Sequence, residues 1–289
     1  MKKNRSNIFL VLMLLIGLSL ILYPSVSDYW NSFHQSRAIA SYAEAVADID
    51  NEKYEALWQS AVAYNEQLSE LGIQWEPTEE QLEAYRRELD VTGTGIMGYI
   101  EIQKINCFLP IYHSTEESVL QIAIGHIEGS SLPVGGPGTH CILSGHRGLP
   151  SARLFTDIDQ LAEGDTFVLR TLDETLTYQV DQIRIVLPYE LDDLKIEPGK
   201  DLCTLVTCTP YGVNTHRLLV RGHRVENAPE ARQIRVTGDA FMIDSLVVAP
   251  LVALPMLLIL FIALLVNSAV KKGRRKALNK LEVRTDENQ

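Results

Sequence analysis

The length, composition and charge of the chain exclude several classes of protein. It has 289 residues, more than one small domain needs and enough for one medium-sized domain with additional segments. Its formal net charge of −11 argues against a nucleic-acid partner, which would require a basic face. The four cysteines form no CxxC pair and no zinc-type Cys/His spacing, so neither a metal nor another cofactor is predicted.

The first segment, residues 1–27, contains an almost wholly apolar run, Ile8–Tyr23, with basic residues before it. The next few residues extend this run toward the length of about 20 residues that a spanning helix needs. We therefore predict a retained N-terminal membrane anchor. A cleaved signal peptide is the alternative, because Ser25-Val26-Ser27 weakly fits a small-x-small cleavage site. Both interpretations direct the following residues to the outside of the cell.

A second apolar run, Leu246–Val266, is uncharged and long enough to cross a bilayer, so residues 246–267 are predicted to form a C-terminal transmembrane helix. Residues 229–245 are the predicted linker before it, and residues 268–289 are a predicted cytoplasmic tail. By the positive-inside rule both ends of the chain are cytoplasmic, which places residues 28–242 outside. The basic residues that follow the second run are Lys271, Lys272, Arg274, Arg275 and Lys276.

Residues 28–95 are predicted to form a helical extension in front of the main domain. The stretch 33–70 is rich in Ala, Glu, Tyr and Leu and contains no Pro or Gly, which predicts one helix. A second helix is predicted over Thr78–Leu89. Gly72 and Pro77 mark the interruption between the two helices.

The sequence changes character in residues 96–228, where short β-branched runs alternate with turn residues. This pattern predicts a mostly β domain of ordinary size. The predicted strands are Met97–Ile102, Leu109–Tyr112, His140–Ser144, Thr166–Arg170, Leu176–Val186, Leu202–Cys208 and His216–Val225.

The last two predicted strands bring a cysteine and an arginine together. Leu202–Cys208 reads as a buried strand, and the turn residues that follow it lead directly into the strand that carries Arg217. In a hairpin centred on this turn, Cys208 and Arg217 are cross-strand neighbours, about 5 Å apart at Cβ. A guanidinium favours the reactive thiolate and can hold a substrate carbonyl as an oxyanion forms on it. This pair therefore predicts nucleophilic catalysis by Cys208.

Acyl transfer through a thiol also needs a proton carrier, because the leaving amine must be protonated. Among the seven histidines the best candidate is His146, where an apolar strand leads into a Gly-His turn. His216 neighbours Arg217 on a strand and so points to the opposite face. His126, which follows a glycine, is the second choice for the proton carrier.

Each of these residues also has an ordinary structural interpretation. A cysteine at a strand end is usually a small core residue, and Arg217 is compatible with a surface ion pair. His146 is equally compatible with a hydrogen-bonded turn. Spacing and residue chemistry alone leave both interpretations open.

Two other cysteines are related to the candidate site by their spacing. Cys141 lies five residues before His146, and Cys203 lies five residues before Cys208. If their strands are parallel neighbours that end level at the site, the two thiols lie close together. We expect both to be buried and reduced, with an oxidised pair as the alternative.

Four ordered stretches resemble the sortase family, and specifically its pilus-assembling class C. Thr204–Gly222, with Thr-Cys-Thr-Pro-Tyr-Gly at its centre, resembles the active-site stretch of these enzymes. Gly98–Ile102 resembles their first strand, and Gly125–Pro133 and Ser144–Pro150 resemble their central motifs. The resemblance covers residues 33–225, and flanking membrane spans are typical of the same class.

The resemblance implies an eight-stranded sortase-type β-barrel with Cys208 as nucleophile, His146 as general acid/base and Arg217 as carbonyl clamp. It implies cleavage of a Leu-Pro-x-Thr-Gly-like sorting signal through a thioacyl enzyme. A lysine amine of another pilin subunit would then accept the acyl group, which assembles pili on a Gram-positive-type surface. The implied partners are pilins or other surface proteins and the membrane.

One stretch departs from the class C pattern. Pilus sortases carry a lid with an Asp-Pro-aromatic motif, whereas the corresponding place here is Trp75-Glu76-Pro77, with Glu for Asp and no aromatic residue after the proline. As a lid, Glu76 would pair with Arg217 and Trp75 would cover the sulfur. The alternative is an ordinary turn in which Thr78 caps the next helix.

Three other functions remain compatible with the sequence. A sortase that anchors surface proteins to cell-wall peptide amines would have the same catalytic residues. A simple cysteine hydrolase would pass the acyl group to water. A non-catalytic, membrane-tethered scaffold would use the barrel only to hold a partner, although the Cys/His/Arg set argues against it.

Overall fold

The computed structural model describes residues 2–227. The predicted linker (229–245), C-terminal transmembrane helix (246–267) and cytoplasmic tail (268–289) lie outside the described residues.

Two long helices precede the barrel: α1 spans Lys2–Ala47 and α2 spans Asn51–Leu71. The prediction of one helix over 33–70 was therefore wrong. The reason is Asp50, whose extended backbone and side chain, accepting from the Lys53 N–H at 2.8 Å, start a new helix. α1 also continues without a break past residue 27, where the sequence suggested the end of the anchor.

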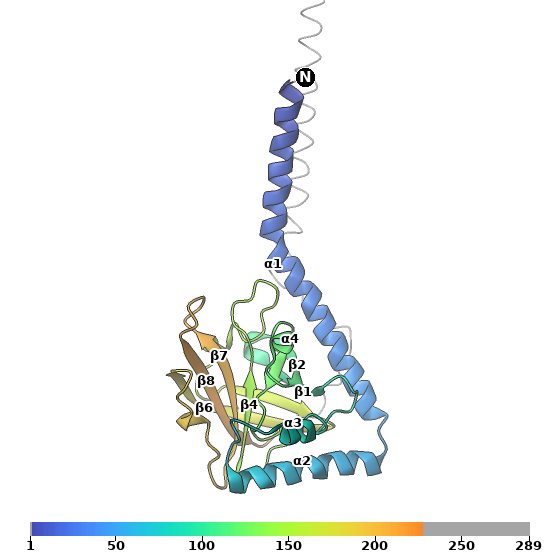
Figure 1. Ribbon diagram of the computed structural model, residues 1–289, viewed down its shortest axis with the longest axis vertical. Helices are drawn as coiled ribbons and strands as arrows, with labels where there is room; N and C mark the ends of the chain where they lie inside the picture. Colours follow the sequence, from blue (N-terminus) through green and yellow to red (C-terminus); the bar gives the residue numbers. More distant parts are fainter. Residues whose placement is uncertain (1, 228–289) are drawn as a thin grey trace, which may run out of the picture. The chain divides into compact units, whose positions relative to one another are not determined.

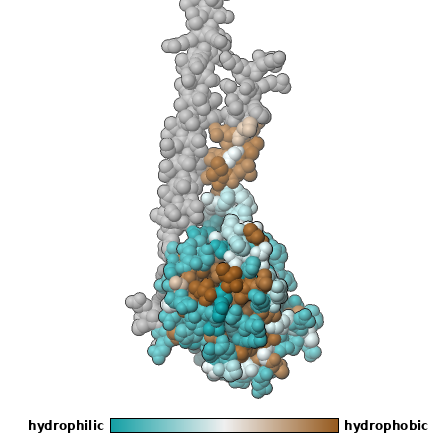
Figure 2. All heavy atoms as spheres, turned by 90° about the vertical axis from the view of Figure 1, so that its left-hand side faces the viewer, coloured by the Kyte–Doolittle hydropathy of each residue, from teal (hydrophilic) through white to brown (hydrophobic). Residues whose placement is uncertain are grey.

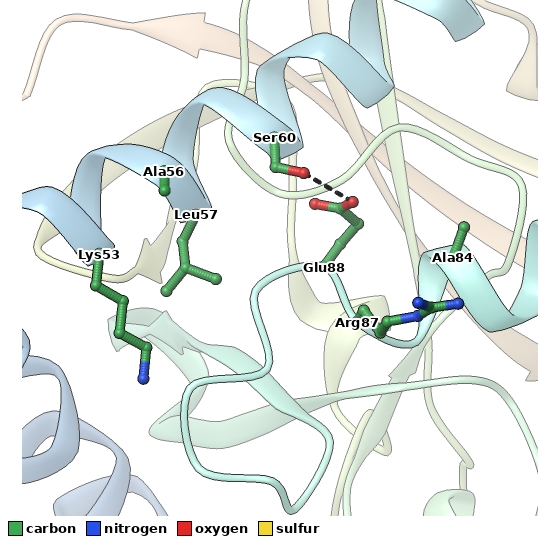
Figure 3. Close-up of a pocket in the computed structure, with 7 residues that line it drawn as sticks. All are labelled: Lys53, Ala56, Leu57, Ser60, Ala84, Arg87 and Glu88. Carbon is green, nitrogen blue, oxygen red and sulfur yellow. Dashed lines mark hydrogen bonds between the residues drawn. The ribbon is translucent and has the colours of Figure 1, made fainter.

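The predicted helix after Pro77 is present but shorter than expected. α3 spans Glu79–Tyr85, and Thr78 caps it in a capping box with Gln81, which is the cap that the alternative interpretation of the lid segment described. A hollow between α2 and the α3 region is shown in Figure 3, where the Ser60 hydroxyl donates to the Glu88 carboxylate at 2.9 Å. None of the predicted catalytic residues lines this hollow.

Eight strands form a closed barrel in the order β1-β2-β3-β4-β7-β8-β6-β5. The seven predicted strands are all present, with ends within two residues of the prediction, and the three-residue strand β3 was missed. The pairs β2–β3 and β4–β7 are parallel, and the antiparallel pair β1–β5 closes the barrel. The strands are β1 Ile96–Ile102, β2 Cys107–His113, β3 Ile124–His126, β4 Thr139–Ser144, β5 Thr166–Thr171, β6 Glu174–Val186, β7 Asp201–Thr209 and β8 His216–Val225.

Short elements connect the strands, and a single large core fills the barrel. The connecting elements are α4 (Glu117–Leu120) and the 3-10 turns η1 (Gln103–Ile105), η2 (Ile158–Gln160) and η3 (Asp192–Leu194). The core includes the fully buried side chains of Ile100, Ile111, Phe167, Leu169, Tyr178 and Leu205. The mostly β, eight-stranded fold class predicted from the sequence is confirmed.

The two long helices pack on the barrel in different places (Figure 1). α1 contacts β1 and β2, and α2 contacts β4. Ile39 and Tyr42 of α1 are fully buried in the core. The Tyr42 hydroxyl donates to the Met97 carbonyl at 3.0 Å and accepts from the Leu172 N–H at 2.9 Å. The second half of α1 is thus part of the domain.

The first half of α1 has a different character. The part from Leu12 onward is long and apolar enough to cross a membrane, and its apolar stretch is not buried against the rest of the protein. An N-terminal membrane anchor is compatible with this helix.

Candidate active site

The hairpin of β7 and β8 pairs the predicted nucleophile with the predicted clamp. Cys208 is directly paired with Arg217 in the antiparallel ladder, as the turn position predicted. Cys208 is partly exposed at the end of β7. The Arg217 guanidinium donates to the carbonyls of Asn214 at 3.3 Å and His216 at 3.1 Å. Within residues 2–227 no carboxylate pairs with Arg217, so its remaining donors are open to a ligand.

The parallel pairing of β4 with β7 brings His146 to the same end of the barrel. Ser144, the last residue of β4, is paired with Val206. The next residue, Gly145, donates from its N–H to the Val206 carbonyl at 3.1 Å and accepts from the Thr207 hydroxyl at 2.7 Å. His146 and Cys208 each follow directly after this junction. The imidazole and the thiol are therefore carried by adjacent strand ends.

The loop after His146 also touches the loop after Cys208. The Tyr211 hydroxyl lies 3.5 Å from the Gly148 carbonyl. A Cβ atom added to Gly148 would lie 2.3 Å from the Tyr211 ring, so the two loops approach as closely as a glycine allows. The Gly148 N–H donates to Thr156 at 3.0 Å, and the Phe155 N–H donates to the His146 carbonyl at 3.1 Å. These contacts hold the His146 loop against the hairpin.

A carboxylate that the sequence did not single out lies beside His146. Glu117, in the short helix α4, has its Oε2 atom 3.5 Å from His146 Nε2. The hydrogen bond from the Gln121 amide, with a smaller contribution from His146, lowers the pKa of Glu117. Glu117 is distant from His146 in the sequence, and no motif marks it, so only the fold reveals this neighbour.

An apolar wall adjoins the paired Cys208 and Arg217. Val206 and Leu219 share the strand faces of Cys208 and Arg217, because each lies two residues away. They form a small cluster with Ile142 and Leu194. The partly buried side chains packed against this cluster are Ile73, Ile127, Val186 and Leu191. Figure 2 shows apolar side chains gathered in the middle of the face that carries β6, β7 and β8.

Ile73, two residues before the predicted lid segment, packs against the cluster that forms this wall. The Gln74 N–H donates to the Gly129 carbonyl at 2.9 Å, which ties the segment to the β3–β4 connection. Trp75 is 37% exposed, and Pro77 lines a hollow between α2 and α3. In the described part of the chain Glu76 makes no ion pair, so the suggested Glu76–Arg217 pair is absent. The segment does not pair with the guanidinium.

The imidazoles of the other histidines that were considered have different partners. His126 is fully buried, with Nδ1 2.9 Å from the Tyr85 hydroxyl and Nε2 2.8 Å from the Ser131 carbonyl. His216 is paired with Thr209 rather than with Cys208, and its Nδ1 lies 2.9 Å from the Thr215 hydroxyl. His126 is therefore a core histidine, which removes it from the candidate site.

The remaining cysteines are in the interior. Cys141 and Cys203 are directly paired across the parallel strands β4 and β7, so the predicted proximity of the two thiols is confirmed. Both are buried and free, as expected. Burial raises the pKa of Cys107 to about 12 and that of Cys203 well above its usual range. Among the four cysteines Cys208 is partly exposed and the other three are buried.

A partly exposed thiol beside an arginine, with an imidazole on the next strand end, is the arrangement of a cysteine acyl-transfer enzyme. Comparison with known proteins specifies the family. A model of the sortase domain matches residues 100–225. Sortase D of Bacillus subtilis (strain 168) is 30% identical over 131 residues, a match that covers 44% of this chain and 63% of that protein.

Solved structures match at higher sequence identity. Sortase C1 from Streptococcus agalactiae is 57% identical with a TM-score of 0.66, and the match covers 66% of this chain and 100% of that one. Sortase C from Streptococcus pneumoniae is 41% identical with a TM-score of 0.59, covering 67% and 99%. The chain belongs to the sortase family of cysteine transpeptidases, and the similar structures are class C sortases.

Proposed function

We propose that the chain is a transpeptidase in which Cys208 is the nucleophile, His146 the general acid/base and Arg217 the carbonyl clamp. The observation that carries this proposal is the convergence of two pairings at one end of the barrel. One is the direct pairing of Cys208 with Arg217, and the other is the junction of Gly145 with Val206 and Thr207. The three functional groups thereby come from three neighbouring strand ends.

The proposed reaction has two acyl-transfer steps. The Cys208 sulfur attacks the carbonyl of the scissile peptide, while the Arg217 donors stabilise the oxyanion that forms. His146 gives a proton to the leaving amine, the C–N bond breaks and a thioacyl enzyme remains. An acceptor amine then gives its proton to His146 as it attacks the thioester, which forms a new amide and releases Cys208.

We propose a Leu-Pro-x-Thr-Gly-like sorting signal as the acyl donor and a lysine amine of a pilin subunit as the acceptor. The apolar wall of Ile142, Val206 and Leu219 offers apolar contact beside the sulfur. The sortase C of Streptococcus pneumoniae has been described for its pilin substrate specificity, which supports a pilin here. The alternative acceptor is a cell-wall peptide amine, as in a sortase that anchors surface proteins.

We further propose the chain's placement in the membrane. The apolar helix in residues 1–27 would be the N-terminal anchor, and residues 246–267 a second span, with the catalytic domain outside and both ends in the cytoplasm. Residues 28–95 would be the extension, and residues 96–228 the catalytic barrel. The segment Trp75-Glu76-Pro77 remains a candidate lid, supported by the packing of the nearby Ile73 against the apolar wall.

The test uses the full-length chain in membranes, a pilin with its sorting signal, and an acceptor pilin. Mass analysis of the product is expected to find an isopeptide bond between the signal threonine and a lysine. Cys208→Ala, His146→Ala and Arg217→Ala are each expected to abolish it. Product formation by Cys208→Ala would exclude the proposed nucleophile.

A second acceptor separates the two candidate functions. The same reaction is run with a cell-wall-type peptide amine in place of the acceptor pilin. Exclusive joining to this peptide would favour the wall-anchoring sortase, and release of free acid with either amine present would favour a hydrolase.

A further inference from the structure

The part of α1 just after the apolar run contacts the backbone of the loop that follows His146. Asp28 accepts a hydrogen bond from the Arg153 N–H at 2.9 Å, and the Asn31 side-chain amide donates to the Ser151 carbonyl at 2.8 Å. Both contacts are to the loop that carries His146.

A third contact reaches the segment that follows α4. The Gln35 side-chain amide, which is buried, donates to the Ile122 carbonyl at 2.6 Å. Ile122 follows α4, the helix whose Glu117 carboxylate lies 3.5 Å from His146 Nε2. α1 therefore touches the segment that carries the imidazole and the segment that carries its neighbouring carboxylate.

These contacts belong to one continuous face of α1. Asp28, Asn31, Gln35, Ile39 and Tyr42 follow each other at intervals of three or four residues, which places them on the same side of the helix. The last two are fully buried in the barrel core, so the helix is fixed there and its preceding turns are held against the His146 region.

We propose that Asp28, Asn31 and Gln35 are positioning residues for His146, so that the membrane-proximal helix forms part of the catalytic apparatus. The inference rests on the proposed role of His146 as general acid/base. None of the three residues touches the reacting atoms. They act through the backbone of the His146 loop and of the α4 segment, because proton transfer depends on where the imidazole is held.

The structure offers closely matched controls. Ser32 and Ser36 lie on the same helix, one residue after Asn31 and Gln35 respectively, and both are exposed. The Ser32 hydroxyl donates only within the helix, to the Tyr29 carbonyl at 2.9 Å. Alanine is the best helix former, so Asn31→Ala and Gln35→Ala remove the contacts without weakening the helix. The double variant N31A/Q35A is compared with S32A/S36A, both as full-length protein in membranes.

The readout separates positioning of His146 from a merely structural effect. Each variant is assayed with a sorting-signal peptide and with its analogue in which the scissile amide is an ester. An ester leaving group depends less on a general acid than an amine does, so a misplaced imidazole slows the amide more. Reaction of Cys208 with a small thiol reagent is measured alongside, because it requires the thiol but not proton transfer to a leaving group.

The expected result for N31A/Q35A is an amide rate lower by about tenfold, a part of the 10²–10⁴-fold that general acid catalysis contributes. The ester rate is expected to fall less, and S32A/S36A is expected to match the wild type. An equal loss on both substrates, or no loss on either, would overturn the inference.

His146→Ala supplies the reference for the proposed function itself. If it shows the selective loss on the amide while N31A/Q35A does not, only the positioning role fails. If His146→Ala keeps the wild-type amide rate, the proposed function fails and the positioning role with it.

Discussion

The four cysteines of the chain differ in what surrounds them, and this determines which can react. Cys107, Cys141 and Cys203 are buried, whereas Cys208 is partly exposed beside the Arg217 guanidinium. Thiolate is the nucleophilic form, and it is favoured by a neighbouring cation and disfavoured in an apolar interior.

We predict that a small thiol reagent such as iodoacetamide modifies only Cys208 in the folded protein. Peptide mapping by mass spectrometry after brief treatment checks this, with the unfolded chain as the reference in which all four thiols react. Cys208→Ala should leave the folded protein unlabelled. Labelling of Cys141 or Cys203 at a rate comparable to Cys208 would contradict the buried positions of these residues.

A buried histidine away from the site should make stability depend on pH. His140 is fully buried, with Nδ1 2.8 Å from the Lys195 carbonyl and Nε2 2.7 Å from the Thr204 hydroxyl. Burial, with a smaller contribution from the Arg221 charge, lowers its pKa from 6.5 to about 4. The unfolded chain therefore binds a proton near pH 6.5, and the folded chain only near pH 4.

Because the unfolded state takes up this proton first, the free energy of unfolding should decrease as the pH falls from about 6.5 to 4. His140→Gln keeps a donor and an acceptor but does not titrate, so its stability should depend less on pH. Between pH 6.5 and 4 the wild type should lose about 2–3 kcal/mol more of its free energy of unfolding than the variant does, from 1.36 kcal/mol per pKa unit. Urea unfolding at several pH values measures it. His113, whose pKa is also lowered by burial, leaves a residual slope in the variant.

The elements show which parts of the fold could be predicted from the sequence. The β7–β8 hairpin was predictable because its turn residues sit between two clear apolar strands, and the Cys208–Arg217 pairing followed from the turn position. Strand β3 was missed because three residues, Ile124–His126, are too few for a period to appear. The break at Asp50 was missed because the surrounding residues all favour helix, and only the cap starts a new one.

The candidate site was predictable only where a local sequence pattern marks its residues. Cys208, His146 and Arg217 each stand at a recognisable strand end, so a local pattern marks them. The Glu117 carboxylate and the contacts from Asn31 depend on how distant segments pack, and no local pattern encodes that.

The contact between the His146 loop and the Cys208 hairpin can be tested by substituting Gly148. Gly148 has φ +74°, and a Cβ atom there would lie 2.3 Å from the Tyr211 ring, so Gly148→Ala must displace that ring. Gly199 has nearly the same φ, +75°, but a Cβ atom there meets nothing within 4 Å. The two alanine variants should therefore lose a similar stability, about 1–2 kcal/mol, from the left-handed backbone alone.

Only Gly148→Ala should also lose activity, because moving Tyr211 separates the His146 loop from the Cys208 hairpin. We expect a lower kcat for this variant, and a kcat close to the wild type for Gly199→Ala. Thermal unfolding and steady-state assays of both variants provide the comparison. Equal activity in the two would mean that the Tyr211 contact does not hold the site.

The described part of the chain joins an apolar helix and a catalytic barrel without a break between them. α1 passes from its apolar half into the half that packs on β1 and β2 as one helix. The sequence indicated a boundary at residue 27 because the apolar composition ends there. Composition marks where the apolar run ends, but a helix can continue past that point when one of its faces is buried farther along.

Tyr42 joins the helix to the barrel through two hydrogen bonds. Its fully buried hydroxyl accepts from the Leu172 N–H and donates to the Met97 carbonyl. Tyr42→Phe would leave both backbone groups without a partner in the core, at a cost of about 1–3 kcal/mol in the free energy of unfolding. Tyr189→Phe is the matched control, because Tyr189 is 75% exposed and its loss of a hydroxyl should be close to neutral.

The same variant should loosen α1 from the barrel before the barrel itself unfolds, because the lost hydrogen bonds connect the helix to β1 and to the β5–β6 turn. Limited proteolysis of the full-length protein in membranes should then cut α1 more rapidly in Tyr42→Phe than in Tyr189→Phe. Since α1 also holds the backbone around His146, the amide rate should decrease together with this protection. Faster cleavage of α1 at an unchanged amide rate would show that the helix anchors the barrel without positioning its active site.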